Sequence, residues 1–228
     1  MLIVIMVIAG VIGVSVLVGT AVIVSRKRAQ VRREELSEKA KDLGMEFRVD
    51  GDTRLQEELN PLGFFQTGHS KKLTNLMQAE TEIASMHAFD YAYTTGSGKN
   101  QTHHTHSVLA ISSDQVALPP FQMRPEGFFD RVGAKLGMQD IDFESHPRFS
   151  ELFVLKSVDD EGTRRFFDAK LLTEFESREG LRLEAERNWF VYIKPHMLPP
   201  VQIREFIDEG FRLFQLFADR VDRDAGQA

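Results

Sequence analysis

Two strand-like runs joined by a glycine-rich turn decide the fold, and they read IASMHAFDYAYTT at residues 83–95 and THHTHSVLAIS at residues 102–112. In the first run, odd and even positions are both largely apolar, which is typical of a central strand covered on both faces. The segment from Thr95 to Asn100 holds two glycines and turns the chain, so the second run returns as an antiparallel partner. The sequence therefore predicts a long hairpin inside a sheet.

Further elements flank this hairpin and give an α+β class with a mainly antiparallel sheet built from hairpins, with helices at its flanks. Pro119 and Pro120 favour an edge position for one of the strands, because proline donates no hydrogen bond to a ladder. We expect strands at residues 116–123, 152–158, 181–185 and 189–193. We expect helices at residues 53–59, 127–136, 163–178 and 201–221. The first of these helices starts with Thr53 and Gln56 in capping-box spacing.

Residues 1–25 contain no Asp, Glu, Lys or Arg, and Met1 to Val24 are almost all apolar. A helix of this length reaches about 36 Å, more than the roughly 30 Å of a bilayer's hydrocarbon core. We therefore expect one transmembrane helix at residues 1–24, a basic helical stalk at 25–44 that stops at Gly44, and a single soluble domain at 45–228.

A basic collar follows the apolar run at once, and it favours the cytoplasmic side of a membrane. This predicts an N-terminus outside, a cytoplasmic domain and a place in a bacterial inner membrane, with residues 1–24 in contact with the lipid bilayer. A cleaved signal peptide is the alternative, but its positive charge would precede the apolar run. Small residues four apart, Ala9 with Gly13 and Ser15 with Gly19, would permit self-association of the span. The collar consists of Arg26, Lys27, Arg28, Arg32 and Arg33.

Charge and cysteine content exclude several functions. The chain carries a net charge of −6, and since the basic collar contributes five positive charges, residues 34–228 carry −11. An acidic body is repelled by phosphate backbones, so no nucleic-acid partner is expected. The chain has no cysteine, which removes thiol catalysis, thiolate metal sites and disulfides.

The densest ionisable cluster is the run from His103 to His106. On a strand, His104 and His106 share a face and would both ligate a metal if a third ligand approached. The other interpretation is aromatic packing across the hairpin against Tyr91 and Tyr93. No cofactor is expected.

Other polar residues give weaker signals. Asp90 lies on an otherwise apolar strand face and needs a partner if it is buried, for which Arg124 and Lys99 are candidates, so we consider it as a functional carboxylate. Gly96 to Lys99 look like a phosphate loop but precede a strand rather than a helix, which favours a hairpin tip. Alternating carboxylates would suit a hard cation or form a solvated loop; they are Asp140, Asp142 and Glu144.

The segments FDYAYTTGSGK (89–99), 118–126 and QDIDF (139–143) followed by His146 and Pro147 resemble uncharacterised bacterial single-span, membrane-anchored proteins that are grouped as a domain of unknown function. The resemblance implies a bacterial source and one anchored domain, and it implies no activity. We expect a membrane-anchored, cytoplasmic-facing, non-catalytic module that binds a protein or small ligand. The alternatives are a membrane-tethered, metal-dependent hydrolase and a structural partner of a larger membrane complex.

Overall fold

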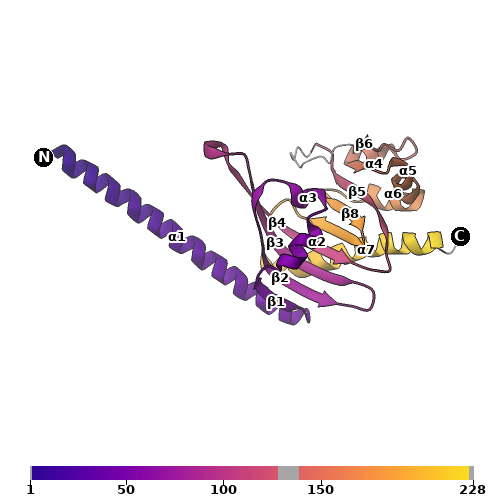
Figure 1. The fold of residues 1–228 in the computed structure, drawn as a ribbon, viewed down its shortest axis with the longest axis horizontal. Helices are drawn as coiled ribbons and strands as arrows, with labels where there is room; N and C mark the ends of the chain where they lie inside the picture. Colours follow the sequence, from indigo (N-terminus) through magenta and orange to yellow (C-terminus); the bar gives the residue numbers. More distant parts are fainter. Residues whose placement is uncertain (1, 128–138, 226–228) are drawn as a thin grey trace.

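A computed structural model describes residues 2–127 and 139–225 of the chain (Figure 1). Its described strands form one sheet of nine strands in the order β1-β2-β3-β4-β9-β8-β5-β7-β6, and all neighbouring pairs are antiparallel. The α+β class with an antiparallel sheet is therefore confirmed. The elements are α1 (Leu2–Asp42), β1 (Glu46–Asp50), α2 (Thr53–Leu59), α3 (Gly63–Gln66), β2 (His69–Glu80), β3 (Ser85–Thr95), the 3-10 turn η1 (Gly98–Asn100), β4 (Thr102–Ser112), β5 (Leu118–Pro125), β6 (Gln139–Asp140), α4 (Pro147–Leu152), β7 (Phe153–Ser157), α5 (Asp160–Phe166), α6 (Ala169–Glu176), β8 (Leu183–Arg187), β9 (Trp189–Ile193), the 3-10 turn η2 (Pro200–Gln202) and α7 (Ile203–Ala225).

The predicted central hairpin is confirmed as β3 and β4, which pair without a break from Ser85 opposite Ser112 to Thr95 opposite Thr102. β3 lies inside the sheet, because β2 pairs with its other edge. Strand β2 was not predicted from the sequence. Two irregularities in its register with β3, between His69 and Lys72 and between Thr74 and Met77, break the alternation that would have marked it as a strand.

The sheet carries a hydrophobic core on each face. Ala88 on β3 belongs to the core beneath α1, α7 and the helices α4 to α6. Phe89 and Tyr91, which point the other way along β3, belong to a smaller core beneath α2 and α3. The amphipathic helix predicted near the C-terminus is confirmed as α7, whose Phe214 and Phe217 are buried.

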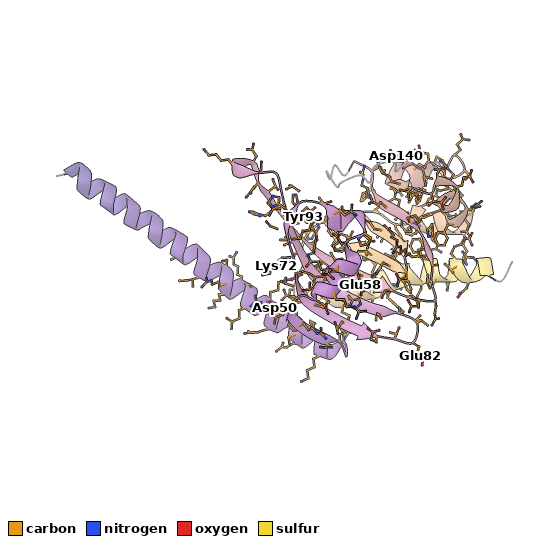
Figure 2. All side chains as sticks on the ribbon, in the orientation of Figure 1. Asp50, Glu58, Lys72, Glu82, Tyr93 and Asp140 are labelled. Carbon is orange, nitrogen blue, oxygen red and sulfur yellow. The ribbon has the colours of Figure 1, made fainter. Side chains whose placement is uncertain are left out.

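Helix α1 is docked at one end and projects from the body at the other (Figure 1). Leu36 and Ala40 are fully buried in the core that α1 shares with α7. The helix stops at Gly44 as expected, since the residue has a φ of +68° that L side chains rarely adopt. In Figure 2, Lys72 and Tyr93 lie on the side of the body from which α1 and the β3–β4 hairpin project, and Asp140 lies on the opposite side.

The prediction of a transmembrane helix is wrong. The side chains described in α1 are those of Thr20 and residues 23–42, and charged residues begin there at Arg26. Over the side chains that the structure describes, no helix has a stretch both long and apolar enough to cross a bilayer. The span proposed for residues 1–24, and with it the single-pass membrane assignment, is corrected by this finding. The orientation inferred from the basic collar rested on that span, and nothing in the fold tests it.

Three local predictions also change. β5 is not an edge strand, because β7 and β8 pair with its two sides, and its register with β8 is irregular around Pro119 and Pro120, which donate no backbone hydrogen bond. The helix expected at residues 163–178 is two helices, since Asp168 caps a new one by accepting a hydrogen bond from the Leu171 N–H. The cap of α2 is Asp52 rather than Thr53. Residues 128–136 of the helix expected at 127–136 lie outside the described residues.

Candidate functional site

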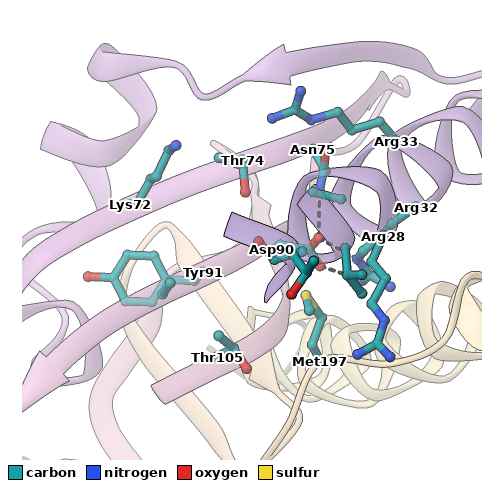
Figure 3. A pocket seen from close by; sticks show the side chains of 15 residues that line it. Arg28, Arg32, Arg33, Lys72, Thr74, Asn75, Asp90, Tyr91, Thr105 and Met197 are labelled. Atoms are coloured by element: carbon teal, nitrogen blue, oxygen red, sulfur yellow. Dashed lines mark hydrogen bonds and ion pairs between the residues drawn. The ribbon is translucent and has the colours of Figure 1, made fainter. Parts of the chain in front are cut away.

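A hollow of about 880 Å³ lies between the middle of α1 and the sheet (Figure 3). Its volume falls within the roughly 300–1,000 Å³ of small-molecule sites. We call it the α1 hollow. Its lining comes from α1, the first half of β2, the centre of β3, one residue of β4 and the loop before η2, and consists of Thr20, Val24, Ser25, Arg28, Ala29, Arg32, Arg33, Lys72, Thr74, Asn75, Asp90, Tyr91, Ala92, Thr105 and Met197.

The hollow exists because α1 leaves the sheet. The helix face that is buried at Leu36 and Ala40 continues one to three turns earlier through Arg32, Ala29 and Ser25, since residues three and four apart share a face. At Leu36 this face contacts the core, whereas at Ala29 it faces open space. The two surfaces that diverge from the point of docking therefore enclose the hollow.

Three side chains at the base of the hollow form a buried network. The Arg32 guanidinium donates from Nε to Asp90 Oδ2 at 2.8 Å and from Nη2 to Asp90 Oδ1 at 2.6 Å, and from Nη1 to the Leu198 carbonyl at 2.6 Å. Asn75 Nδ2 donates to Asp90 Oδ2 at 2.7 Å. The side chains of Arg32 and Asp90 are only 14% and 9% exposed, so this bidentate pair is largely screened from water.

The backbone of β2 places Asn75 for this contact. Asn75 has a φ of +53° and lies in the register irregularity between Thr74 and Met77. Asparagine tolerates this left-handed conformation better than most residues. Its Oδ1 is buried and accepts no hydrogen bond from the described residues. The bulge thus turns a polar side chain of β2 toward Asp90, one strand away.

Three cations of the lining form no ion pair or hydrogen bond with another described side chain. Arg28, Arg33 and Lys72 are exposed, and none has a side-chain partner among the described residues. Arg32 is offset by Asp90, the one acidic residue of the lining, so the lining carries a net charge of +3. The surroundings of the hollow favour an anion.

The lining holds few of the groups that most often act in acid–base catalysis. Among its described residues there is no histidine or cysteine, and its one carboxylate, Asp90, is committed to Arg32 and Asn75. Burial raises the pKa of Tyr91, and Tyr93 adds to this effect, so its hydroxyl stays protonated. The Tyr91 ring packs on Phe65, on the far face of the sheet.

Asp90, predicted as a buried carboxylate, is buried, but its partner is neither Arg124 nor Lys99. The partner is Arg32, which the sequence assigned to a membrane-proximal basic collar. Of that collar, Arg28 and Arg33 also line the hollow, whereas Arg26 and Lys27 do not. The sequence could not pair Arg32 with Asp90, because 58 residues separate them and no local pattern connects them.

His104 and His106 lie on β4 and both stack on Tyr93, with ring centroids 4.8 and 5.5 Å away. His104 Nε2 contacts Thr95 Oγ1, and His106 Nδ1 contacts the Lys194 carbonyl oxygen, each at 2.9 Å. The expected packing across the hairpin is therefore present. Within residues 2–127 and 139–225, no three His, Asp or Glu side chains are grouped to hold a metal. Metal binding at these histidines stays a prediction.

The remaining sequence signals lie away from the hollow. Gly96 to Lys99 form the tip of the β3–β4 hairpin with a single 3-10 turn, as expected, and no helix follows that could bind phosphate. Asp140 lies on β6, where it pairs with Lys156 at 2.8 Å. One sequence signal does point to the hollow. Residues 1–33, 60–79 and 91–113 contain no Asp or Glu, and all three stretches contribute to its lining.

Comparison with known proteins identifies the fold and no family. No family model and no curated protein matches the chain. The crystal structure of the mycobacterial trehalose monomycolate transport factor A, TtfA, superposes with a TM-score of 0.60 at 15% identity, covering 83% of this chain and 94% of that chain. At this identity the likeness shows a shared fold alone. The resemblance to an uncharacterised bacterial family stays a prediction, and the chain is similar in fold to TtfA over most of its length.

Proposed function

We propose that this protein is a non-catalytic binding module whose ligand occupies the α1 hollow. The observation that carries the proposal is the hollow itself: about 880 Å³ of space, lined by both apolar and cationic side chains, whose one carboxylate is held in a structural network. Sites of this kind bind small molecules through apolar contact and orient them with a few polar groups.

The shared fold adds support. TtfA is named as a transport factor, and a transport role requires binding of a cargo or a partner. We carry over to this chain only the idea of an accessory protein that binds, because likeness of fold does not by itself transfer function.

The test is to fill the hollow. A neutral, environment-sensitive probe, N-phenyl-1-naphthylamine, should bind the wild-type protein with increased fluorescence. Ala29→Trp and Ala92→Trp add bulk to two walls of the hollow and should each weaken probe binding at least tenfold. Ala169→Trp is the matched control, because Ala169 is an exposed residue of α6 that does not line the hollow.

Thermal unfolding of each variant accompanies the titration, so that loss of fold is separated from loss of the site. Equal probe affinity in the wild type and both lining variants would overturn the proposal. A change confined to Ala29→Trp and Ala92→Trp, with Ala169→Trp unchanged, would support it.

A further inference from the structure

We infer that the α1 hollow selects a single-chain amphiphile with an anionic headgroup, which Arg28, Arg33 and Lys72 bind. The inference rests on the proposed function and names the class of ligand for the same site. The lining supports it, because three cations without an ion-pair partner among the described residues lie beside apolar side chains.

The cations come from two elements on opposite sides of the space. Arg28 and Arg33 lie on α1 and Lys72 lies on β2, and Figure 3 shows these three side chains around Asp90 and Asn75. Ion pairing with Asp90 already satisfies Arg32. The three other cations have no protein partner among the described residues, so an incoming anion binds them without displacing a carboxylate.

Arginine suits this role chemically. Its planar guanidinium offers parallel N–H donors that match phosphate and carboxylate oxygens, whereas the lysine ammonium acts as a point charge. Guanidinium and ammonium groups on the walls of the hollow favour a phosphate or carboxylate and disfavour a cationic group by like-charge repulsion.

Apolar side chains lie beside the cationic ones, and Ala92 of β3 is the cross-strand partner of Lys72. Val24 precedes Arg28 by four residues, about 6 Å along the helix, and 49% of it is exposed. Met197, which is 39% exposed, and Ala92 line the hollow from the loop before η2 and from β3. Exposed apolar side chains beside unpaired cations match a ligand that joins an alkyl chain to a charged headgroup.

The charge of the whole chain sharpens this selectivity. The three acid-free stretches that contribute to the hollow, residues 1–33, 60–79 and 91–113, hold eight Lys and Arg. Because the chain has a net charge of −6, the remaining residues carry −14. The segments that contribute to the hollow are therefore more attractive to an anion than the acidic remainder of the chain.

The experiment compares amphiphiles with the same twelve-carbon chain, below their critical micelle concentrations, at about 0.15 M salt, where surface charges are screened over about 8 Å. Dodecyl phosphate is the anionic probe, dodecyl maltoside the neutral one and dodecyltrimethylammonium the cationic one. Inorganic phosphate distinguishes an amphiphile site from a site for a free anion. Each compound is titrated against the N-phenyl-1-naphthylamine complex, and displacement is measured.

Dodecyl phosphate should bind at least tenfold more tightly than dodecyl maltoside. The variant Arg28→Gln/Arg33→Gln and the variant Lys72→Gln should lose most of this preference while their affinity for dodecyl maltoside stays unchanged. Arg26→Gln/Lys27→Gln is the matched control: it removes two charges from the same helix outside the lining, and should keep the preference.

Equal affinity for the anionic and neutral amphiphiles would overturn the inference while leaving the proposed function intact, provided that Ala29→Trp still blocks the probe. Loss of preference in the Arg26→Gln/Lys27→Gln control would also overturn it, because nonspecific attraction to α1 would then explain the binding. Displacement by inorganic phosphate at the same concentration as dodecyl phosphate would show that the twelve-carbon alkyl chain contributes nothing to binding. That result would likewise exclude an amphiphile site.

Discussion

Asp90 accepts hydrogen bonds from two side chains of different elements, Arg32 on α1 and Asn75 on β2. Asp90→Ala leaves a largely buried guanidinium without its carboxylate, and we expect a loss of about 3 kcal/mol in the free energy of unfolding. Urea unfolding at pH 7 measures it. Glu58→Ala is the control, because Glu58 pairs with Arg54 in solvent and should change the free energy of unfolding by less than about 1 kcal/mol.

A double variant checks whether that loss comes from the broken pair. Arg32→Met/Asp90→Leu removes both charges and keeps apolar bulk, so it should cost less than Asp90→Ala alone. If the double variant were at least as unstable as the sum of the two single changes, the pair would not be the source of the effect.

His87 gives the protein a pH dependence near neutrality. Burial lowers its pKa below the ordinary 6.5, outweighing the attraction of Glu80, Glu58 and Asp52 for the charged form. The unfolded chain therefore binds a proton at a pH where the folded chain does not, so stability is lost as the pH falls below 6.5 toward the folded pKa. His87→Gln should flatten the unfolding free energy between about pH 6.5 and 5, measured by urea titration. An unchanged slope in His87→Gln would assign the pH dependence to other groups.

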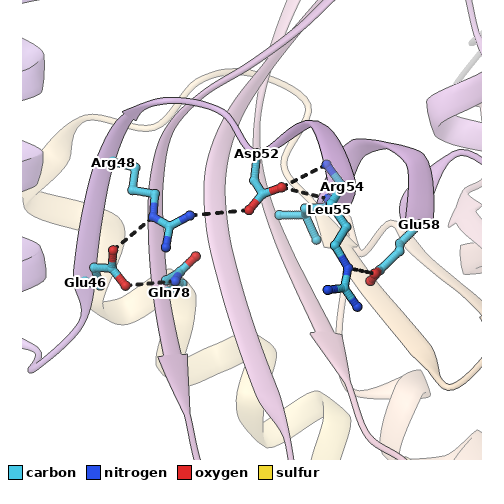
Figure 4. A network of polar contacts seen from close by, with 7 residues as sticks. All are labelled: Glu46, Arg48, Asp52, Arg54, Leu55, Glu58 and Gln78. Carbon is cyan, nitrogen blue, oxygen red and sulfur yellow. Dashed lines mark hydrogen bonds and ion pairs between the residues drawn. The ribbon is translucent and has the colours of Figure 1, made fainter.

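At the scale of elements, short helices depend on their caps. The Asp52 side chain accepts hydrogen bonds from the Arg54 and Leu55 N–H groups at 2.8 and 3.2 Å, and it also contacts Arg48 (Figure 4). Since α2 has only seven residues, we expect Asp52→Ala to cost about 1 kcal/mol of unfolding free energy. Asp52→Asn should recover most of that loss, because the amide oxygen still accepts both bonds; a loss as large as in Asp52→Ala would show that charge rather than capping matters.

Docking of α1 depends on a few buried side chains near its end. Leu36 is 2% exposed, and Leu36→Ala should destabilise the protein by about 2–4 kcal/mol, because a cavity forms where α1 meets the core. Val31, on the same helix, is 43% exposed, and Val31→Ala should change stability by less than about 0.5 kcal/mol. Equal effects of the two changes in thermal or urea unfolding would contradict this packing.

Sequence periodicity predicted the elements whose partners lie next to them in the chain, and it failed where the partner is distant. The hairpin from Ser85 to Ser112 and the apolar face of α7 follow from alternation and from three- and four-residue spacing. β2 was missed because its bulge at Asn75 breaks the alternation. The hollow could not be predicted from periodicity, since it needs α1 to meet Asp90 across 58 residues.

At the scale of the molecule, charge is unevenly distributed along the chain. The acid-free stretches contribute +8 and the remainder −14, so the protein should be retained at pH 7 and low salt by both an anion exchanger and a cation exchanger, despite its pI of about 5.7. Lys71→Glu/Lys72→Glu lowers the charge of the acid-free stretches from +8 to +4, so it should weaken retention on the cation exchanger and leave retention on the anion exchanger unchanged or stronger. Unchanged retention of this variant on the cation exchanger would place the attraction elsewhere.

The length of α1 relative to its short docked end has a mechanical consequence. Arg32 lies 30 positions after Leu2 on α1, which corresponds to about 45 Å of helix. A tilt of roughly 10° about Arg32 would therefore move the N-terminal end of the helix by about 8 Å. In such a tilt, the Arg32–Asp90 pair lies beside the pivot of the helix. A ligand that wedges the α1 hollow open by a small amount would produce a much larger displacement at the other end of the helix.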